Sequence, residues 1–443
     1  MHLEYGQCKW LRAAWLGGVA YNDRMDQSHS DVLILGAGVV GLSCALYLLK
    51  AGASVRVLEQ GTPGCGSSHG NCGTITPSHA APLAMPGTFG LALRSMLRAD
   101  APLYLNPRFD GARLRWLLGF ARHCNWSDFH RAAAARSAIL QRSRQVMAEL
   151  IHAEGIECEF VEGGELYVYR TAKLQAADEC HHAAVLDHLG VRVQRLGGAE
   201  VEAMEPALKP GVVGGLFHPG DARLRPDRYV AALAQRVRDL GGAIVGGAKI
   251  DRLDTDGNRL AHVRSTRGVF SGERVVMALG AWSPLLGRQL GLRLPMQPGK
   301  GYSITYARPA RAPRFALVLR EPAVCVTTWA SGYRLGSTME FSGYAEGLNR
   351  TRLDALRRGA ADGLHEPEGP ELLEEWWGWR PMSVDEVPII GPSTRWSNLH
   401  LATAHGMLGV SMSAATGELV AAQIAGGVPA IDPEPYAPAR FGL

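Results

Sequence analysis

The chain has 443 residues and a formal net charge of +4, from 46 lysines and arginines against 42 aspartates and glutamates. This length predicts two or three domains, and so small a charge excess gives no reason to expect a nucleic-acid partner. Eight scattered cysteines without a Cys-x-x-Cys pair, and no apolar run of about 18 residues, predict no metal, no disulfide framework, no membrane span and a reducing, cytoplasmic location.

The first 27 residues precede the first predicted strand. Residues 9–20 resemble the apolar core of a secretory signal, but Arg12 interrupts that core and Met25 offers a compact start. We therefore expect residues 1–27 to be a disordered extension or a misplaced start rather than a targeting segment.

A strand, a glycine-rich turn and a helix follow over 32–50. Gly36 allows a tight turn, Gly38 lets a pyrophosphate approach the backbone, and Gly41 lets the helix pack close to the strand. A second strand then ends at Glu59, whose carboxylate can accept hydrogen bonds from a ribose. In a chain with 53 glycines this spacing alone is expected about once by chance, so the strand, helix and acid around it carry the prediction of a dinucleotide site.

Residues 61–169 are predicted to contain a loop, then helices, then a strand. Residues 61–73 form a loop of small and hydroxyl-bearing residues that is suited to wrap a polar ligand. A helical pattern is expected over 89–153, and alternation over 163–169 predicts a strand.

A second segment of the nucleotide-binding domain is predicted further along the chain. It contains a helix that starts at Pro226, followed by short strands near Ile250 and over 261–283. Residues 291–375 alternate as a second sheet, and a last helix is expected over 411–425. The sequence thus predicts an α/β (α+β) fold with two interleaved domains. We expect the nucleotide-binding domain over 28–88, 200–290 and 376–430, and the substrate domain over 89–199 and 291–375.

Four motifs in this order carry a family resemblance. They are the fingerprint of 36–59, the loop Ser67-Ser68-x-x-Asn71-x-Gly73, residues 276–283, and Gly378-x-Arg380-Pro381 with 405–409. Together they resemble the FAD-dependent D-amino acid oxidase and dehydrogenase superfamily over about residues 30 to 430. Residues 81–87, 300–303 and 336–340 look most like the bacterial D-amino acid dehydrogenase branch, which includes enzymes acting on D-hydroxyproline.

The resemblance implies FAD in a Rossmann-like domain, next to a substrate domain built on a mixed or antiparallel sheet with helices. The residues expected to bind FAD are Gly36, Gly38, Val39, Val40, Gly41, Glu59, Gln60, Ser67, Ser68, Asn71, Cys72, Gly73, Ile250, Gly280, His405, Gly406, Met407, Leu408, Gly409, Val410 and Ser411.

The resemblance also implies that Arg380 clamps the substrate carboxylate, which a guanidinium does with two parallel hydrogen bonds. The sequence departs from the glycine oxidase pattern, where a second arginine stands at the position of Met407. A tyrosine hydroxyl is the expected replacement. Tyr302 is the first candidate, and those behind it are Tyr333, Tyr344 and His79.

The expected function is FAD-dependent oxidation of a D-amino acid, such as D-proline or D-hydroxyproline, by hydride transfer from the α-carbon to flavin N5. A quinone or respiratory acceptor would take the electrons. The alternatives are an amine, glycine or sarcosine-type oxidase that uses oxygen, a flavoprotein subunit of a heteromeric dehydrogenase, and a nicotinamide-dependent dehydrogenase.

An arginine-rich stretch leaves a second question open. Its arginines could form a solvated face, or could contact a partner subunit or the inner face of the cytoplasmic membrane. They are Arg94, Arg98, Arg108, Arg113, Arg115 and Arg122.

Overall fold

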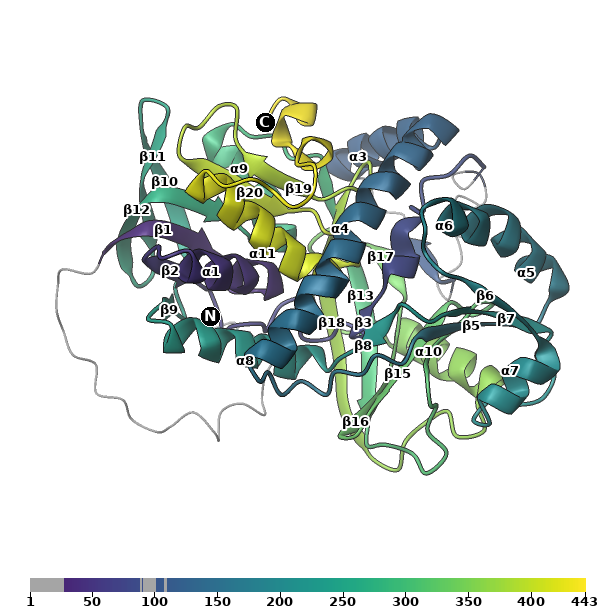
Figure 1. Cartoon of the computed structure of the whole chain (residues 1–443). Coiled ribbons are helices and arrows are strands. Elements are labelled where there is room, and N and C mark those ends of the chain that lie inside the picture. Colours follow the sequence, from purple (N-terminus) through teal and green to yellow (C-terminus); the bar gives the residue numbers. More distant parts are fainter. Residues whose placement is uncertain (1–27, 88–89, 91–100, 107–109) are drawn as a thin grey trace.

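The computed structural model describes residues 28–87, 90, 101–106 and 110–443, and two large sheets organise them (Figure 1). The extension predicted over 1–27 lies outside these residues, as do Arg94, Arg98 and Arg108 of the arginine-rich stretch. Within the described part of the chain, no helix combines the length and the apolar character that crossing a membrane requires.

The first sheet contains the predicted nucleotide-binding unit. Its strand order is β10-β11-β12-β1-β2-β9, with β20 beside β12 and β19 beside β20. The strands β9, β2, β1, β12 and β20 run parallel, as in an open α/β sheet that binds ligands at its carboxyl edge. The bounds are β1 His29–Leu35, β2 Val55–Leu58, β9 Ala243–Val245, β10 Ile250–Asp256, β11 Arg259–Ser265, β12 Gly268–Met277, β19 Ile389–Pro392 and β20 Leu399–Thr403.

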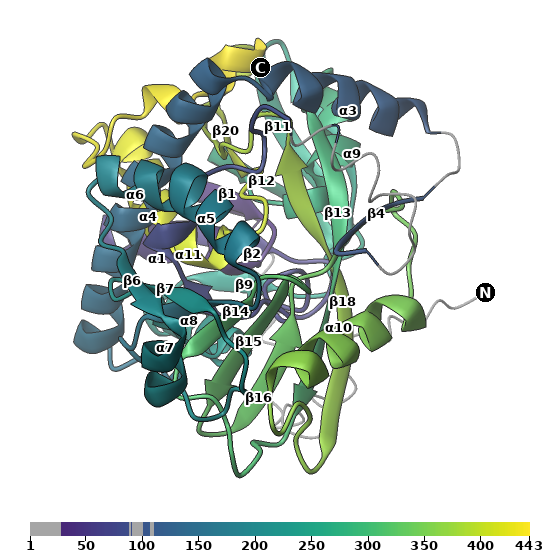
Figure 2. The same cartoon turned by 90° about the vertical axis from the view of Figure 1, so that its right-hand side faces the viewer.

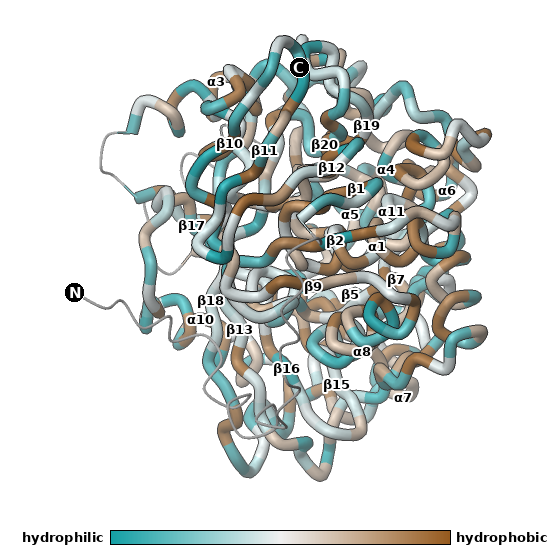
Figure 3. Tube along the Cα trace, turned by 90° about the vertical axis from the view of Figure 1, so that its left-hand side faces the viewer, coloured by the Kyte–Doolittle hydropathy of each residue, from teal (hydrophilic) through white to brown (hydrophobic). Residues whose placement is uncertain are grey.

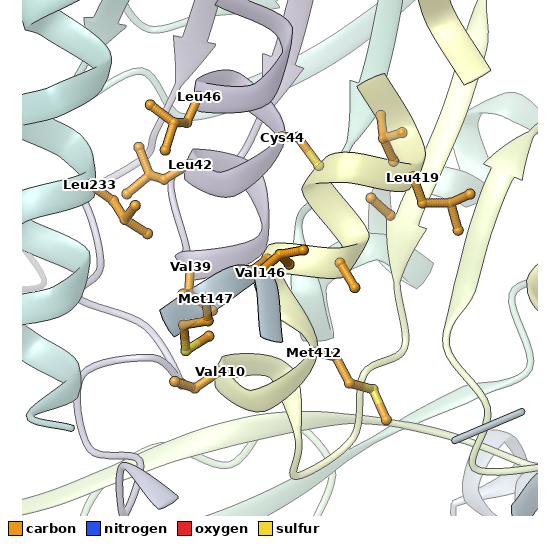
Figure 4. Close-up of a cluster of buried hydrophobic side chains, with 14 of the residues drawn as sticks. Val39, Leu42, Cys44, Leu46, Val146, Met147, Leu233, Val410, Met412 and Leu419 are labelled. Carbon is orange, nitrogen blue, oxygen red and sulfur yellow. The ribbon is translucent and has the colours of Figure 1, made fainter. Parts of the chain in front are cut away.

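Four helices form the core beside this sheet. α1 (Val39–Lys50) lies between α8 (Pro226–Asp239) and α11 (Gly409–Ala425), and α4 (Trp126–Ala153) packs on α11. Figure 4 shows their apolar side chains meeting, with Leu42 of α1 toward Leu233 of α8. The tube in Figure 3 is accordingly brown over much of β1, β2 and α1.

The second sheet is mixed, as the resemblance implied. Its order is β4-β17-β13-β16-β15-β14-β5-β7-β6, and β18 pairs with β13 along its whole length. The bounds are β4 Leu103–Leu105, β5 Glu165–Tyr169, β6 Gln194–Gly197, β7 Gly214–His218, β13 Met296–Tyr306, β14 Ala316–Leu319, β15 Val324–Trp329, β16 Gly332–Gly336, β17 Met339–Phe341 and β18 Leu372–Ser383. A small pair, β3 (Thr74–Ile75) with β8 (Ala222–Arg223), joins the two units.

The two faces of the second sheet differ. One face is apolar and is covered by α10 (Arg350–Gly363) and α7 (Gly198–Met204), as Figure 2 shows for α10. The opposite face looks toward the first sheet. Because successive side chains of a strand point to opposite faces, the strand register decides which residues can meet a ligand between the sheets.

The structure differs from the sequence analysis in three places. The stretch 89–153, expected to be helical, contains strand β4 and two helices, α3 (Gly111–His123) and α4. The side chain of Asn125 ends the continuity because it caps the start of α4, accepting the N–H of Asp128 at 3.0 Å. Strands β7 and β18, placed by the sequence with the nucleotide-binding domain, pair within the second sheet instead.

The remaining helices are short. Among the described residues the other α-helices are α5 (Ala172–Asp178), α6 (Ala184–His188) and α9 (Ser283–Gly287), and the short helical turns include η2 (Pro77–Ala80).

Candidate active site

A cavity of about 1510 Å³ lies between the two sheets. This exceeds the roughly 300–1,000 Å³ that ordinary small-molecule sites occupy, so there is room for a long cofactor together with a substrate. The cavity is lined at one end by the start of α1 and the end of β2, and at the other end by strands of the second sheet.

The start of α1 is built as an anion site. Gly36 has a φ of +102°, and a Cβ on Gly41 would lie 2.0 Å from the Gly36 carbonyl oxygen, so both positions require glycine. The N–H of Val39 donates to Ser68 Oγ at 3.1 Å, while within the described residues the N–H groups of Val40 and Gly41 make no hydrogen bond. With no acidic side chain in the first turn, free N–H groups and the helix dipole favour a pyrophosphate.

Glu59 lies at the end of β2 and is fixed by the backbone. Its Oε2 accepts a hydrogen bond from the N–H of Ala37 at 2.8 Å, and its Oε1 accepts one from Gly61 at 3.0 Å. Burial raises the pKa of Glu59 above its ordinary value. The carboxylate of Glu59 is therefore fixed in place as a hydrogen-bond acceptor for a ribose, as the glycine-rich fingerprint predicts.

The loop of residues 67–73 is held to the second sheet by Arg334 of β16. One nitrogen of its guanidinium donates to the carbonyls of His69 (2.9 Å) and Asn71 (2.7 Å), and Nε donates to Thr305. Asn71 in turn accepts the N–H of Gly73 at 2.7 Å. The sequence analysis missed Arg334, because its partners on the loop lie more than 260 positions away in the chain.

Most of the residues expected to bind FAD line this one cavity. Gly41, Gly73 and Ser411 are the exceptions among the described residues. Gly41 and Gly73 act through close backbone packing, and Ser411 donates its hydroxyl to the Thr74 carbonyl at 2.9 Å. His405 lines the cavity as a neutral group, because burial lowers its pKa to about 3, and its Nε2 lies 2.9 Å from Thr416 Oγ1. The residues present thus fit a dinucleotide along the length of the cavity.

Arg380 lies at the other end, on β18. Its Nη1 donates to the Thr338 carbonyl at 2.7 Å, and a Cβ on Gly301 would lie 2.3 Å from its Cζ, so the guanidinium rests on β13 where glycine leaves space. Burial lowers the pKa of Arg380. Among the described residues no carboxylate pairs with Arg380, whereas the buried Arg136 is paired with Glu386 at 3.4 Å. A half-buried cation that faces a cavity without a protein anion is a site for an anionic ligand.

Tyr302 is not brought to the cavity. Gly299 pairs with Arg380 and Tyr302 pairs with Trp377, so Tyr302 and Arg380 point to opposite faces of the sheet. Tyr302 lies in the apolar cluster under α10, and its hydroxyl donates to Glu340 at 2.9 Å. Among the candidates behind it, Tyr333 and Tyr344 donate to backbone carbonyls and do not line the cavity, whereas His79 does.

The sequence analysis also missed three tryptophans of β18 and Cys325 of β15, whereas Cys72 was expected to bind FAD. Trp376, Trp377 and Trp379 of β18 line the cavity, and of these three Trp376 points to the same face of the strand as Arg380. Cys72 of the loop and Cys325 of β15 line it too, and the hydrogen bond between these thiols, with the charges of Arg380 and Arg334, lowers the pKa of Cys72. The alternation of side chains along 163–169 and 324–329 could have indicated which residues of each strand share a face of the sheet. It could not have indicated that this face meets the loop 67–73.

Comparison with known proteins agrees with this geometry. The sequence matches the family described as FAD dependent oxidoreductase over residues 31–423. The D-amino acid dehydrogenase of Rhizorhabdus wittichii is 37% identical over 409 residues, covering 90% of this chain and 97% of the relative. That of Granulibacter bethesdensis is 35% identical over 417 residues, covering 93% of this chain and 99% of the relative.

Solved structures share the fold at low sequence identity. Glycine oxidase from Geobacillus kaustophilus superposes with a TM-score of 0.74 at 23% identity, covering 93% of this chain and 98% of that one. L-Proline dehydrogenase from P. horikoshii gives a TM-score of 0.70 at 18% identity, covering 94% and 98%.

Proposed function

The chain belongs to the family of FAD dependent oxidoreductases, and from this premise we propose that it oxidises a D-amino acid at the Cα–N bond. Membership of the family confirms the predicted resemblance, the FAD cofactor and the oxidoreductase class. The curated relatives with about a third of their residues identical are D-amino acid dehydrogenases, which supports the D configuration.

The observation that carries the proposal is Arg380. Its half-buried guanidinium has no carboxylate partner in the described part of the chain and lines the same cavity as the dinucleotide loop. Amino acids bring a carboxylate two bonds from the nitrogen that is oxidised. A guanidinium that binds this carboxylate therefore fixes where the α-carbon lies.

The protein's own residues would position the substrate and the cofactor and exclude water from them. They would not form covalent bonds with the substrate. Bound FAD supplies a two-electron acceptor. Residues 38–41 and Glu59 would hold its pyrophosphate and ribose, the loop 67–73 its middle, and residues 405–410 the far edge of the flavin. Trp376, on the same face of β18 as Arg380, adds an apolar ring to this end of the cavity, and low polarity around the guanidinium strengthens its attraction to a carboxylate.

Anaerobic bleaching of the bound flavin tests the proposal. Each member of a panel of D- and L-amino acids, including D-proline, cis-4-hydroxy-D-proline and sarcosine, is mixed with the protein while the visible spectrum is recorded. At least one D-amino acid should bleach the flavin faster than its L enantiomer. Bleaching by L-amino acids or by sarcosine alone would overturn the D-amino acid assignment.

We extend the proposal to the electron acceptor, for which a quinone or another respiratory carrier is the candidate. Trp116, Leu117 and Phe120 of α3 line the cavity, while Leu114 and Leu118 of the same helix are about half exposed. A helix that joins the cavity to an apolar patch suits an apolar acceptor, and Arg115 and Arg122 beside the patch suit an anionic membrane surface.

Turnover with a soluble quinone is compared with turnover with oxygen to test this extension. Quinone should support the faster reaction, and anionic vesicles should retain the protein in a flotation assay at low salt. Stoichiometric hydrogen peroxide at an equal rate would make the protein an oxidase and reject the quinone.

A further inference from the structure

Cys72 and Cys325 lie side by side on the cavity face of the second sheet. Cys325 of β15 pairs with Gly336 of β16, and residues directly opposite each other in an antiparallel pair share a face, with Cβ atoms about 4.5–5.5 Å apart. A Cβ on Gly336 would lie 2.6 Å from Cys72 Sγ, so this sulfur occupies the space that a side chain at position 336 would fill. The two sulfurs are therefore neighbours, and their thiols form a hydrogen bond.

The loop that carries Cys72 is fixed on both sides of this residue. The carbonyl of Asn71 accepts a hydrogen bond from Arg334 at 2.7 Å, and the N–H of Gly73 donates to Asn71 Oδ1 at 2.7 Å. A Cβ on Gly73 would lie 2.1 Å from a backbone carbonyl oxygen, so the loop is packed tightly against another segment at this point. The backbone thus holds the Cys72 sulfur beside Cys325.

The two thiols differ in reactivity. Both line the cavity, so a small molecule in the cavity can reach them. The hydrogen bond that Cys325 donates, together with the charges of Arg380 and Arg334, lowers the pKa of Cys72. The same hydrogen bond and burial raise the pKa of Cys325. Because the thiolate is the nucleophilic form of cysteine, Cys72 is the sulfur that reacts first, and Cys325 is the thiol beside it.

We propose that Cys72 and Cys325 are a redox modification site, at which hydrogen peroxide converts the two thiols into a disulfide. The Cys72 thiolate attacks one oxygen of the peroxide, the O–O bond breaks, and the leaving hydroxide takes up the proton that Cys72 has lost. Cys325 Sγ then attacks the sulfenic sulfur of Cys72. The S–O bond breaks as the S–S bond forms, and the Cys325 proton leaves with the hydroxyl as water. Two thiols are thus oxidised by two electrons, and one peroxide is reduced to two molecules of water.

The disulfide has a consequence for the loop 67–73. An S–S bond is about 2.05 Å long, much shorter than the contact between two thiols, so Cys72 must move toward β15 when the bond forms. The loop would hold the middle of bound FAD, and its displacement should slow the reduction of the flavin. This consequence rests on the proposed function, whereas the bond itself goes beyond it. Peroxide is also the product when oxygen replaces a quinone as the acceptor, so the site would respond to that replacement.

Mass spectrometry of the wild-type holoenzyme tests the bond without any substrate. The protein is treated with hydrogen peroxide, its remaining thiols are alkylated, and the non-reduced digest is searched for peptides that Cys72 and Cys325 join. The joined peptides should appear before the exposed Cys180 is oxidised, and dithiothreitol should remove them. Oxidation of other cysteines without the joined peptides would overturn the modification site.

Two substitutions test the order of the steps. Cys325→Ser leaves Cys72 without a partner thiol, so Cys72 should accumulate as a sulfenic acid, which dimedone traps. In Cys72→Ser, Cys325 should remain a free thiol under the same treatment. Cys180→Ser is the matched control and should form the disulfide as the wild-type protein does. Dimedone on Cys325 in Cys72→Ser, with none on Cys72 in Cys325→Ser, would overturn the assignment of Cys72 as the attacking sulfur.

The rate of anaerobic flavin reduction by a D-amino acid measures the consequence. Peroxide-treated wild-type protein should be reduced at least tenfold more slowly than untreated protein, and dithiothreitol should restore the rate. Cys72→Ser should show the same rate before and after treatment. An equal loss of rate in Cys72→Ser would overturn the consequence, because peroxide would then act elsewhere. Wild-type flavin that no amino acid reduces, in a protein that forms the disulfide, would overturn the proposed function and leave the modification site supported.

Discussion

At the scale of single residues, Arg380 decides how the substrate is held. Arg380→Lys keeps a positive charge but loses the planar pair of donors, so kcat/KM should fall by about one to two powers of ten. Arg380→Ala should lower it further. The visible FAD spectrum should stay nearly unchanged in both variants, as recorded by absorbance before steady-state assays with a D-amino acid.

Gly301→Ala provides a matched change next to Arg380. Its added Cβ would displace the guanidinium without removing it, and kcat/KM should fall while FAD is retained. Loss of flavin in Arg380→Ala, with normal oxidation after reconstitution, would instead assign Arg380 to the cofactor.

Another residue-scale prediction concerns His400, which lies far from the substrate end on β20. Burial lowers the pKa of His400 to about 4, below the 6.5 of an unperturbed histidine. The unfolded chain therefore binds this proton first as the pH falls. The stability that neutral His400 retains above about pH 6.5 is lost toward pH 4, at up to about 1.4 kcal/mol per pH unit.

Urea unfolding at pH 7.5 and pH 5 measures this loss. Between these pH values the free energy of unfolding should drop about 2 kcal/mol more in the wild-type protein than in His400→Gln. His152→Gln, which changes an exposed histidine of α4, is the control and should show the same drop as the wild type. Equal drops in all three proteins would show that His400 titrates normally in the folded state.

At the scale of elements, the turn between β1 and α1 depends on close packing. Gly41→Ala would place a Cβ against the Gly36 carbonyl, so α1 must move away from β1 and the anion site at its start must open. FAD retention after gel filtration should fall at least tenfold. Gly111→Ala at the start of α3 has open space around it and should retain FAD fully. Full retention in both variants would show that the turn tolerates the displacement.

The loop 67–73 is held to the second sheet by Arg334, and also by Ser67 on the Trp379 carbonyl and by His69 on Glu374. Arg334→Lys cannot reach the carbonyls of His69 and Asn71 together, so the loop should loosen and the Kd for FAD should rise about tenfold or more. Fluorescence titration of the apoprotein with FAD measures this. An unchanged Kd would mean that the loop is held by its other contacts.

These elements also show what the sequence could predict. The unit of residues 32–59 was predictable because the glycines, the helix and the acid are local signals. Tyr302 was placed wrongly relative to Arg380 because its direction depends on the pairing of β13 with β18, two strands far apart in the chain. The same distance hid Arg334 and the assignment of β7 and β18 to the second sheet, since no local pattern encodes which strands become neighbours.

At the scale of the whole molecule, FAD should be bound without a covalent bond. The cysteines of the described residues are free, and Cys72 and Cys325, which line the cavity, contact each other. Heat or acid should therefore release the yellow colour into the supernatant, where FAD is identified by chromatography. Colour that remains in the precipitate would demonstrate a covalent link.

The order of strands in the first sheet has a consequence for synthesis of the protein. β1 and α1 emerge early from the ribosome, but β1 pairs with β12, β12 pairs with β20, and α1 packs on α11. β12 starts about 240 residues after β1, and α11 starts about 370 residues after α1, so these neighbours are translated much later. Until then β1 of a nascent chain is paired on one edge only, with β2, and the side of α1 that packs on α11 is uncovered. Cofactor loading is thus a late event, and chaperones have a long interval in which to bind the growing chain.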